Sequence, residues 1–289
     1  MIRPWHGIMV ATALPFTGDL TVDHDAYAAH CRRLVDEGCD GVVPNGSLGE
    51  YQTLTPDERA RVVRTAVEAV GGDRVMPGVA AYGSREALTW AEQARDAGCA
   101  SVMLLPPNAY RAGEDAVLEH YRTVSKAGLP IVAYNNPIDT KVDLTPALLA
   151  KLFGEGLIVA VKEFSGDVRR AYEIQEVAPG LDVLVGSDDV VVELLTAGAK
   201  GWVAGFPNSV TRQCVELYRA AEAGDLRTAV PLYRDLHPLL RWDARVEFVQ
   251  AIKLSMDVAG LNGGACRPPR LPLPPATAAG IRAATEKVM

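Results

Sequence analysis

Short apolar runs alternate with longer amphipathic stretches along the whole chain. The runs occupy residues 7–14, 40–45, 74–80, 101–106, 130–136, 157–163, 182–186 and 201–205. Each run is rich in Val, Ile or Leu, and polar residues do not occupy every second position. Runs of this kind are typical of parallel strands that are covered on both faces. The pattern therefore predicts eight buried parallel strands.

The stretches between the runs have the periodicity of amphipathic helices. They occupy residues 23–37, 55–70, 84–97, 113–127, 145–153, 167–178, 188–197 and 208–223. One of them opens with a clear start signal, because Thr55 is a candidate N-cap, Pro56 takes the first helical position, and Glu58 completes a capping box. The sequences DEGCDGVV, DAGCASVM and TAGAKGWV share one arrangement: a helix ends at a glycine, and a strand follows directly.

Eight strands alternating with helices over roughly 220 residues predict a (β/α)₈ barrel, the α/β fold known as the TIM barrel. We expect this barrel to occupy residues 1–224. An open doubly wound sheet is the alternative, but no GxGxxG motif follows the first run. After residue 224 the pattern is helical, with helices expected at 225–241, 244–259 and 274–287 and a proline-rich hinge at 266–275. Residues 225–289 are therefore expected to form a C-terminal helical extension packed on the barrel.

Composition and charge exclude several classes of function. The chain has 289 residues, of which 48% are apolar and 22% charged, and its net charge is −7. An acidic chain does not attract nucleic acid or an anionic membrane surface. The N-terminus does not resemble a signal peptide, and no run reaches the roughly 18 apolar residues of a membrane span. The five cysteines are widely spaced and form no CxxC pair, which favours reduced thiols and a cytoplasmic location. No HExxH motif or metal-ligand spacing occurs, so no metal or other cofactor is predicted.

Lys162 interrupts the sequence IVAVKEFSG, residues 158–166, near the end of a predicted strand. A lone lysine at a strand end commonly lies along its apolar stem and keeps its ammonium in water. The other interpretation is a buried amine, because burial disfavours the charged form and lowers the pKa of a lysine. A neutral lysine amine can attack a carbonyl carbon and form a Schiff base.

Two further features occur at the ends of other predicted strands. Tyr134 takes the matching position in the run 130–136, and the run 40–45 leads into NGSLGE, residues 45–50. Active sites of such barrels lie at the C-terminal ends of the strands, so these features are expected to converge. Each alone has an ordinary explanation, as a buried tyrosine or a plain turn, although the N–H groups of a glycine turn can also bind an anion. A lysine, a phenol and an anion-binding turn together are what Schiff-base chemistry on a 2-oxo acid requires.

The motifs GSLGE, YNNP and VKEFSGD, in this order and spacing, resemble the dihydrodipicolinate synthase and N-acetylneuraminate lyase superfamily. The resemblance covers nearly the whole chain and includes TALPF near the N-terminus and the GSDD turn at 186–189. It implies a (β/α)₈ class I aldolase, lyase or dehydratase that is metal-independent and forms a homo-oligomer, a tetramer or a dimer. It also implies roles for individual residues: Lys162 forms the Schiff base and Tyr134 moves protons. By the same resemblance Gly46, Ser47 and Leu48 hold the substrate carboxylate, and Val203 lines the pocket floor.

Three positions depart from the pattern of the synthase itself. Leu48 replaces a hydroxyl residue of the glycine turn. Asp139 stands where the synthase has an arginine for a second carboxylate, although Lys141 follows two residues later. Asn108 stands where the synthase has an aromatic hydroxyl, although Tyr110 is close. The motifs SGDVRR and GGACRPP resemble branches that degrade hydroxylated 2-oxo acids, including 4-hydroxy-2-oxoglutarate aldolases and hydroxyproline-pathway deaminases. We therefore expect a lyase or dehydratase for a hydroxylated 2-oxo acid or its cyclic imine.

Three alternatives stay open from the sequence. The first is dihydrodipicolinate synthase activity, the condensation of pyruvate with aspartate semialdehyde. The second is a protein that binds a 2-oxo acid without turnover, because Leu48 and Asn108 would interrupt the proton relay. The third is a metal-dependent barrel aldolase, which the lack of a ligand motif disfavours.

Overall fold

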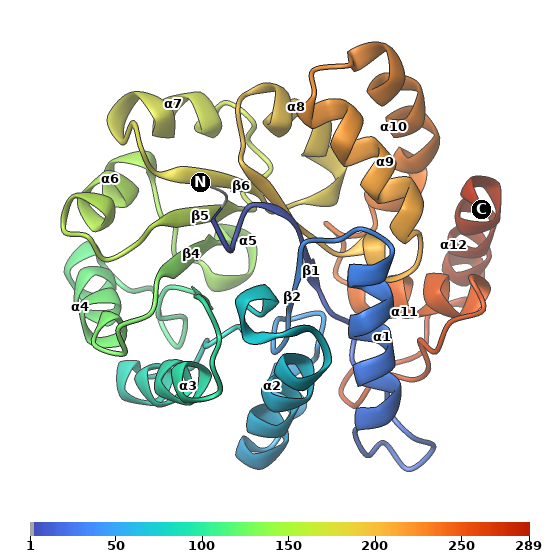
Figure 1. Ribbon diagram of the computed structural model, residues 1–289, viewed down its shortest axis with the longest axis horizontal. Coiled ribbons are helices and arrows are strands. Elements are labelled where there is room, and N and C mark those ends of the chain that lie inside the picture. Colours follow the sequence, from blue (N-terminus) through green and yellow to red (C-terminus); the bar gives the residue numbers. More distant parts are fainter. Residues whose placement is uncertain (1–2) are drawn as a thin grey trace.

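Parallel strands form the centre of the molecule, and helices surround them (Figure 1). The structure is a computed structural model that describes residues 3–289. The strands are β1 (Gly7–Ala11), β2 (Gly41–Val43), β3 (Val102–Leu104), β4 (Ile131–Asn135), β5 (Ala160–Glu163), β6 (Asp182–Val185) and β7 (Gly201–Ala204). They form one sheet in the order β2-β1-β7-β6-β5-β4-β3, and every pairing is parallel.

The predicted strand at 74–80 differs from the others, because it is not a regular strand. Val75 makes a parallel bridge to β2, and Gly78 makes a parallel bridge to β3, so this segment lies between the two ends of the sheet. Pro77 has no N–H group to donate, which interrupts a regular hydrogen-bond ladder. The predicted (β/α)₈ barrel is confirmed, and one of its eight predicted strands is corrected to an irregular segment.

Helices alternate with the strands in chain order, and all of them except the short α5 cover the outside of the sheet (Figure 1). They are α1 (His24–Asp36), α2 (Pro56–Val70), α3 (Ser84–Asp96), α4 (Glu114–Ser125), α5 (Pro137–Thr140), α6 (Pro146–Gly154), α7 (Arg170–Val177), α8 (Val191–Thr196) and α9 (Thr211–Glu222). Short 3₁₀ turns are η1 (Tyr51–Thr53), η2 (Gly72–Arg74), η3 (Asp188–Val190) and η4 (Phe206–Asn208). The capping box of Thr55 and Glu58 at the start of α2 is confirmed, and Gly38 and Gly98 follow α1 and α3 with φ of +106° and +90°.

One predicted helical stretch of the barrel is divided in the structure, and one short helix was not predicted. The stretch 188–197 divides into η3 and α8, because the side chain of Asp188 turns inward and accepts hydrogen bonds from buried donors. Helix α5 was not predicted. It has four residues, too few for a periodic pattern, and it begins at an Asn136 N-cap followed by Pro137.

The three last helices lie together on one side of the barrel, at the right in Figure 1. They are α10 (Leu226–Leu240), α11 (Phe248–Val258) and α12 (Pro275–Val288). Helix α10 packs against α9, and α11 packs against α12. Division of the chain into two units at residue 224 stays a prediction. Residues 241–247 form turns between α10 and α11, whereas the sequence pattern predicted a helix from residue 244.

The barrel has two buried layers, which follow from the alternation of side chains along each strand. In β4, Ile131 and Ala133 pack in the layer between strands and helices. Val132 and Tyr134 belong to the other layer, inside the barrel, together with Ala160 of β5. Since Lys162 lies two residues beyond Ala160, its side chain also points into the barrel.

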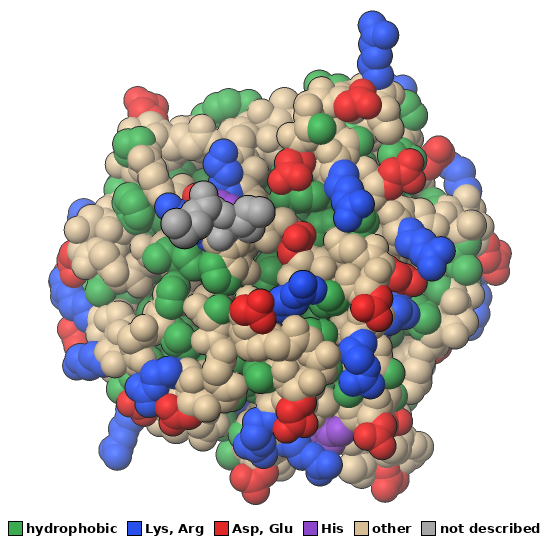
Figure 2. Space-filling model, in the orientation of Figure 1, with side chains coloured by type: hydrophobic (Ala, Val, Ile, Leu, Met, Phe, Trp, Pro, Cys, Tyr) green, Lys and Arg blue, Asp and Glu red, His purple; other side chains and the backbone are tan. Residues whose placement is uncertain are grey.

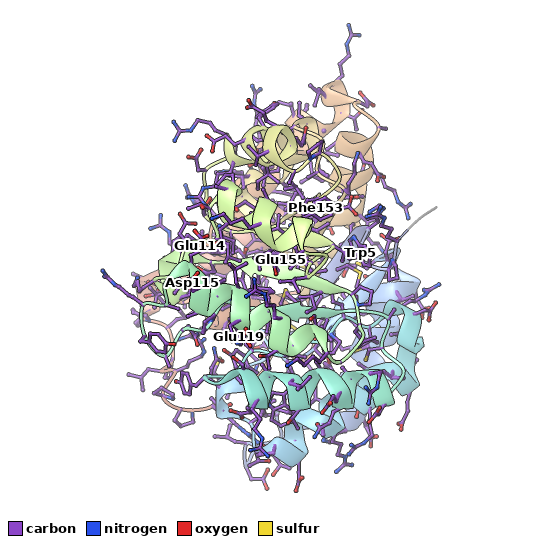
Figure 3. All side chains as sticks on the ribbon, turned by 90° about the vertical axis from the view of Figure 1, so that its left-hand side faces the viewer. Trp5, Glu114, Asp115, Glu119, Phe153 and Glu155 are labelled. Atoms are coloured by element: carbon purple, nitrogen blue, oxygen red, sulfur yellow. The ribbon has the colours of Figure 1, made fainter. Side chains whose placement is uncertain are left out.

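The outer surface carries charges of both signs. Figure 2 shows acidic and basic side chains interspersed over one face of the molecule. Figure 3 shows Glu114, Asp115 and Glu119 along α4, with Glu155 nearby. Glu155 pairs with Arg122 through two oxygens at 2.8 and 2.7 Å, so part of this acidic face is neutralised locally. Within residues 3–289, no helix combines the length and the apolar character needed to cross a membrane.

Candidate active site

A cavity of about 310 Å³ opens at the C-terminal ends of the strands. Its lining includes eight of the nine residues singled out from the sequence: Gly46, Ser47, Leu48, Asn108, Tyr134, Asp139, Lys162 and Val203. Tyr110 does not line it, and its side chain is 63% exposed. The loop turns the Tyr110 ring away from the cavity of its own chain, and a role for Tyr110 in place of the missing aromatic hydroxyl stays a prediction.

Lys162 and Tyr134 are neighbours on adjacent strands. They are register partners in the parallel pairing of β4 and β5, so their side chains leave the sheet at the same level and on the same face. The Lys162 Nζ atom lies 4.3 Å from the centroid of the Tyr134 ring and 5.7 Å from that of Phe164. Only 6% of Lys162 is exposed, so its ammonium does not extend into open water.

Burial changes the acid–base behaviour of the lysine. Loss of hydration lowers the pKa of the Lys162 amine, while the negative charges of Asp243 and Asp188 oppose this decrease. A lowered pKa increases the fraction of neutral amine at a given pH. The neutral form is the one that can attack a carbonyl carbon.

Tyr134 is held by a short polar chain. Asn136 Nδ2 donates to the Tyr134 hydroxyl at 3.3 Å and to Asp139 Oδ2 at 2.9 Å. Burial raises the pKa of the Tyr134 phenol, and the charge of Asp243 raises it further. A raised pKa favours the neutral phenol, which is the form that can donate a proton.

The glycine turn presents backbone donors to the cavity. Asn45, at φ +56°, directs the chain into residues 46–48. Within the described part of the chain, no acceptor lies within hydrogen-bonding distance of the N–H groups of Ser47 and Leu48. The Leu48 side chain is 2% exposed and packs into the core, so the turn offers the cavity mainly its backbone and the Ser47 hydroxyl. Free N–H groups beside a buried amine suit a carboxylate ligand.

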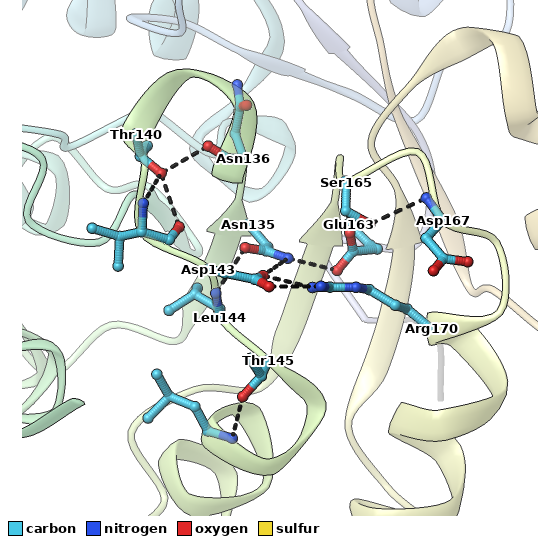
Figure 4. A network of polar contacts seen from close by, with 12 residues as sticks. Asn135, Asn136, Thr140, Asp143, Leu144, Thr145, Glu163, Ser165, Asp167 and Arg170 are labelled. Atoms are coloured by element: carbon cyan, nitrogen blue, oxygen red, sulfur yellow. Dashed lines mark hydrogen bonds and ion pairs between the residues drawn. The ribbon is translucent and has the colours of Figure 1, made fainter. Parts of the chain in front are cut away.

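A polar network behind the site fixes the ends of β4 and β5 (Figure 4). Asn135 Nδ2 donates to Glu163 Oε2 at 2.9 Å, which joins the two residues that follow the reactive pair on their strands. The Leu144 N–H donates to Asn135 Oδ1 at 2.9 Å. Arg170 binds both oxygens of Asp143 at 2.6 Å, and Asp143 Oδ1 also accepts from Asn135 at 3.3 Å. These contacts tie together the ends of the two strands from which Tyr134 and Lys162 project.

Sequence reasoning missed the contribution of the C-terminal extension. Asp243, Arg245 and Arg270 line the cavity, although they are far from the barrel motifs in the chain. Asn136 was also missed as a residue that contacts Tyr134, even though it belongs to the motif YNNP. No periodic or local signal marks residues 241–247 as part of a site, because their place is set by the packing of the surrounding helices.

Among residues 3–289, no group of three or more His, Cys, Asp or Glu side chains is arranged to hold a metal ion. The titratable and charged groups of the cavity are an amine, two phenols, two carboxyl groups and two guanidinium groups.

Known proteins match the chain along almost its full length. A model of the dihydrodipicolinate synthetase family matches residues 4–287. A 4-hydroxy-tetrahydrodipicolinate synthase from Desulforudis audaxviator is 32% identical over 273 residues, which cover 93% of this chain and 92% of that protein. An uncharacterized DapA-like lyase from Rhizobium meliloti is 33% identical over 273 residues, which cover 93% of this chain and 91% of that protein.

A solved structure with a bound ligand is also similar. It is YagE, a prophage protein of the dihydrodipicolinic acid synthase family from E. coli K12, in complex with pyruvate. It matches with a TM-score of 0.90 and 26% identity, covering 98% of each chain. The similarity therefore includes both the barrel and the C-terminal helices.

Proposed function

The chain belongs to the dihydrodipicolinate synthetase family, and we propose that it is a lyase in which Lys162 forms a Schiff base with a 2-oxo acid. Members of this family are class I aldolases and lyases, so the chain is an enzyme of that class. The observation that carries the proposal is the buried Lys162 amine beside the Tyr134 phenol, in a cavity that also presents free N–H groups.

Each of these groups has a place in the proposed reaction. The turn at residues 46–48 holds the C1 carboxylate of the substrate, and the neutral Lys162 amine attacks the adjacent C2 carbonyl carbon. Loss of water then gives an iminium ion, which accepts the electron pair released when a bond to C3 is broken. Tyr134 supplies or removes the proton that the bond cleavage requires.

We further propose that the substrate carries a hydroxyl group beyond C2. The Asp139 carboxylate lines the cavity and is anchored by Asn136 at 2.9 Å, so it can accept a hydrogen bond from that hydroxyl. Lys141, which could have offset the charge of Asp139, donates to the Ile138 carbonyl and does not line the cavity. Arg245 and Arg270 do line the cavity and can meet a distal carboxylate.

The second candidate function is the condensation of pyruvate with aspartate semialdehyde. Relatives that bear the name 4-hydroxy-tetrahydrodipicolinate synthase favour it, and so does the pyruvate bound to YagE. Both candidate reactions use the same Schiff base. They differ in the substrate group that lies next to Asp139.

We expect kcat/KM for cleavage of 4-hydroxy-2-oxoglutarate to exceed that for the semialdehyde condensation by about ten- to a hundredfold. One hydrogen bond to a charged group is worth about 1.5–3 kcal/mol, which corresponds to that range. Steady-state kinetics of the unmodified enzyme with both substrate pairs measure the ratio. Asp139→Arg should lower kcat/KM for the hydroxylated acid. A condensation that is tenfold faster or more would instead assign this chain as a synthase.

Replacement Tyr134→Phe should lower kcat by about 10²–10⁴-fold while the fold persists, because proton transfer typically contributes that factor. The change keeps the ring that packs beside Lys162 and removes only the hydroxyl. Tyr172→Phe is the matched control, since Tyr172 is 60% exposed on α7 and does not line the cavity. Near-normal turnover of Tyr134→Phe, together with a loss in Tyr110→Phe, would transfer the role to Tyr110.

A further inference from the structure

A second carboxyl group lines the cavity, and the chemistry above does not use it. Asp243 lies in the turns at residues 241–247 and is 9% exposed. Its Oδ2 accepts a hydrogen bond from the Asp188 N–H at 3.2 Å. Its Oδ1 lies beside Gly205, so close that a Cβ at that position would be 2.7 Å away. Glycine at position 205 therefore allows the carboxyl group to reach the floor of the cavity.

The neighbouring Asp188 has a different environment. Its carboxylate accepts hydrogen bonds from Trp202 Nε1 at 2.9 Å, from the Gly205 N–H at 3.1 Å and from the Phe206 N–H at 2.7 Å. It does not line the cavity. Burial raises the pKa of Asp188 to about 6, while these donors oppose the increase by stabilising the charged form. Asp188 is therefore the structural carboxylate of the pair, and Asp243 is the one that faces substrate.

Two buried carboxyl groups that lie near each other do not both ionise readily. Burial, and next the charge of Asp188, raise the pKa of Asp243 well above its usual value, while Lys162 opposes the increase. Asp189 adds a smaller effect in the same direction as Asp188. The other charged or titratable groups of the cavity are Tyr51, Tyr134, Asp139, Arg245 and Arg270. A neutral Asp243 can donate a proton at pH values at which an exposed aspartate is already ionised.

The positions of the two proton donors around Lys162 are complementary. Tyr134 lies on β4, the neighbour of β5 on one side. Asp243 lies against Asp188 and Gly205, which follow β6 and β7 on the other side of β5. The amine on β5 thus has a phenol on one flank and a carboxyl group on the other.

We propose that Asp243 is the acid that expels water from the carbinolamine on Lys162, and that its carboxylate then pairs with the iminium ion. The inference rests on the proposed Schiff-base function. Attack of the Lys162 amine on C2, with transfer of one amine proton to the carbonyl oxygen, gives a neutral carbinolamine. Asp243 then gives its proton to the carbinolamine hydroxyl, which leaves as water while the nitrogen lone pair forms the C=N bond. The products are a cationic iminium and an anionic Asp243, so the two new charges arise next to each other.

Iminium formation with pyruvate tests this role, because pyruvate has no distal group for Asp243 to recognise. Enzyme and pyruvate are mixed, quenched with sodium borohydride after set delays, and the reduced adduct is followed by intact mass across a pH series. The unmodified enzyme should show a rate that rises with pH as Lys162 loses its proton and falls as Asp243 does. Asp243→Asn should slow iminium formation by about 10²–10⁴-fold and remove the falling limb.

Two further variants complete the design. Asp243→Glu keeps the acid and should retain a falling limb, shifted in pH, with a rate above that of Asp243→Asn. Asp235→Asn removes an exposed carboxylate of α10 and should match the unmodified enzyme.

An unchanged rate and pH profile in Asp243→Asn would overturn the inference while leaving the Schiff base intact. If Asp243→Asn does not fold, an unshifted falling limb in Asp243→Glu would overturn it. Absence of any adduct at Lys162 in the unmodified enzyme would contradict the proposed function itself.

Discussion

Lys162→Ala is expected to abolish both the borohydride-trapped adduct and turnover while the barrel remains folded. Loss of an essential nucleophile can cost on the order of 10⁶ in kcat, because no other group can form the covalent intermediate. The substitution removes a buried amine whose Nζ lies over the Tyr134 ring. Intact mass after treatment with a 2-oxo acid and borohydride measures the adduct, and peptide mapping locates it.

Two other lysines provide matched controls for this result. Lys200 precedes β7 and lies at the opposite end of the barrel, and Lys141 is exposed after α5. Alanine at either position should leave one adduct per chain. An adduct that maps to Lys141 or Lys200 in the unmodified protein would refute the assignment of Lys162.

The pH dependence of adduct formation carries independent information. Because burial lowers the pKa of Lys162, the neutral amine should prevail at pH values where an exposed lysine is still charged. The rate of adduct formation should therefore rise with pH through that lowered pKa, below the range in which ordinary lysines titrate. A rising limb near pH 10 would mean that the amine is hydrated in solution.

The features that were predictable from sequence are those with local and repeated signals. The helix starts and stops, such as the Thr55 capping box and the glycine after α1, depend on neighbouring residues and were found. The placement of Lys162 beside Tyr134 was also found, because alternation along two adjacent parallel strands fixes which side chains share a face.

The features that sequence reasoning missed depend on contacts between distant segments. Asp243 follows α10 in a turn, and its approach to the cavity depends on Gly205 and Asp188, which precede it by tens of residues. The raised pKa of Tyr134 has the same origin, because burial and a carboxyl group from the C-terminal extension set it. Tyr110 was close in sequence to the expected position, but the course of its loop decides where the ring points.

A buried ion pair connects the glycine turn to the C-terminal extension. Lys253 Nζ on α11 lies 3.0 Å from Glu50 Oε1, and the two side chains are 1% and 0% exposed. Lys253 also donates to the Ala265 carbonyl at 2.7 Å, and the Arg267 N–H donates to the other Glu50 oxygen at 2.8 Å. Since Glu50 ends the turn that presents the free N–H groups, this pair links the extension to the proposed carboxylate site.

Lys253→Met should lower the free energy of unfolding by about 3–5 kcal/mol, because it leaves the Glu50 carboxylate buried without its partner. The double variant Glu50→Gln, Lys253→Met should be more stable than Lys253→Met, since it removes the uncompensated charge. Lys287→Met is the matched control: Lys287 pairs with Asp235 at the same 3.0 Å, but both side chains are more than half exposed. Its expected cost is below about 1 kcal/mol.

Urea unfolding curves of the unmodified protein and the three variants, recorded at the same protein concentration, measure these differences. Of the two single variants, only Lys253→Met should also raise KM for the 2-oxo acid. Equal costs for Lys253→Met and Lys287→Met would show that the buried pair does not hold the turn to the extension.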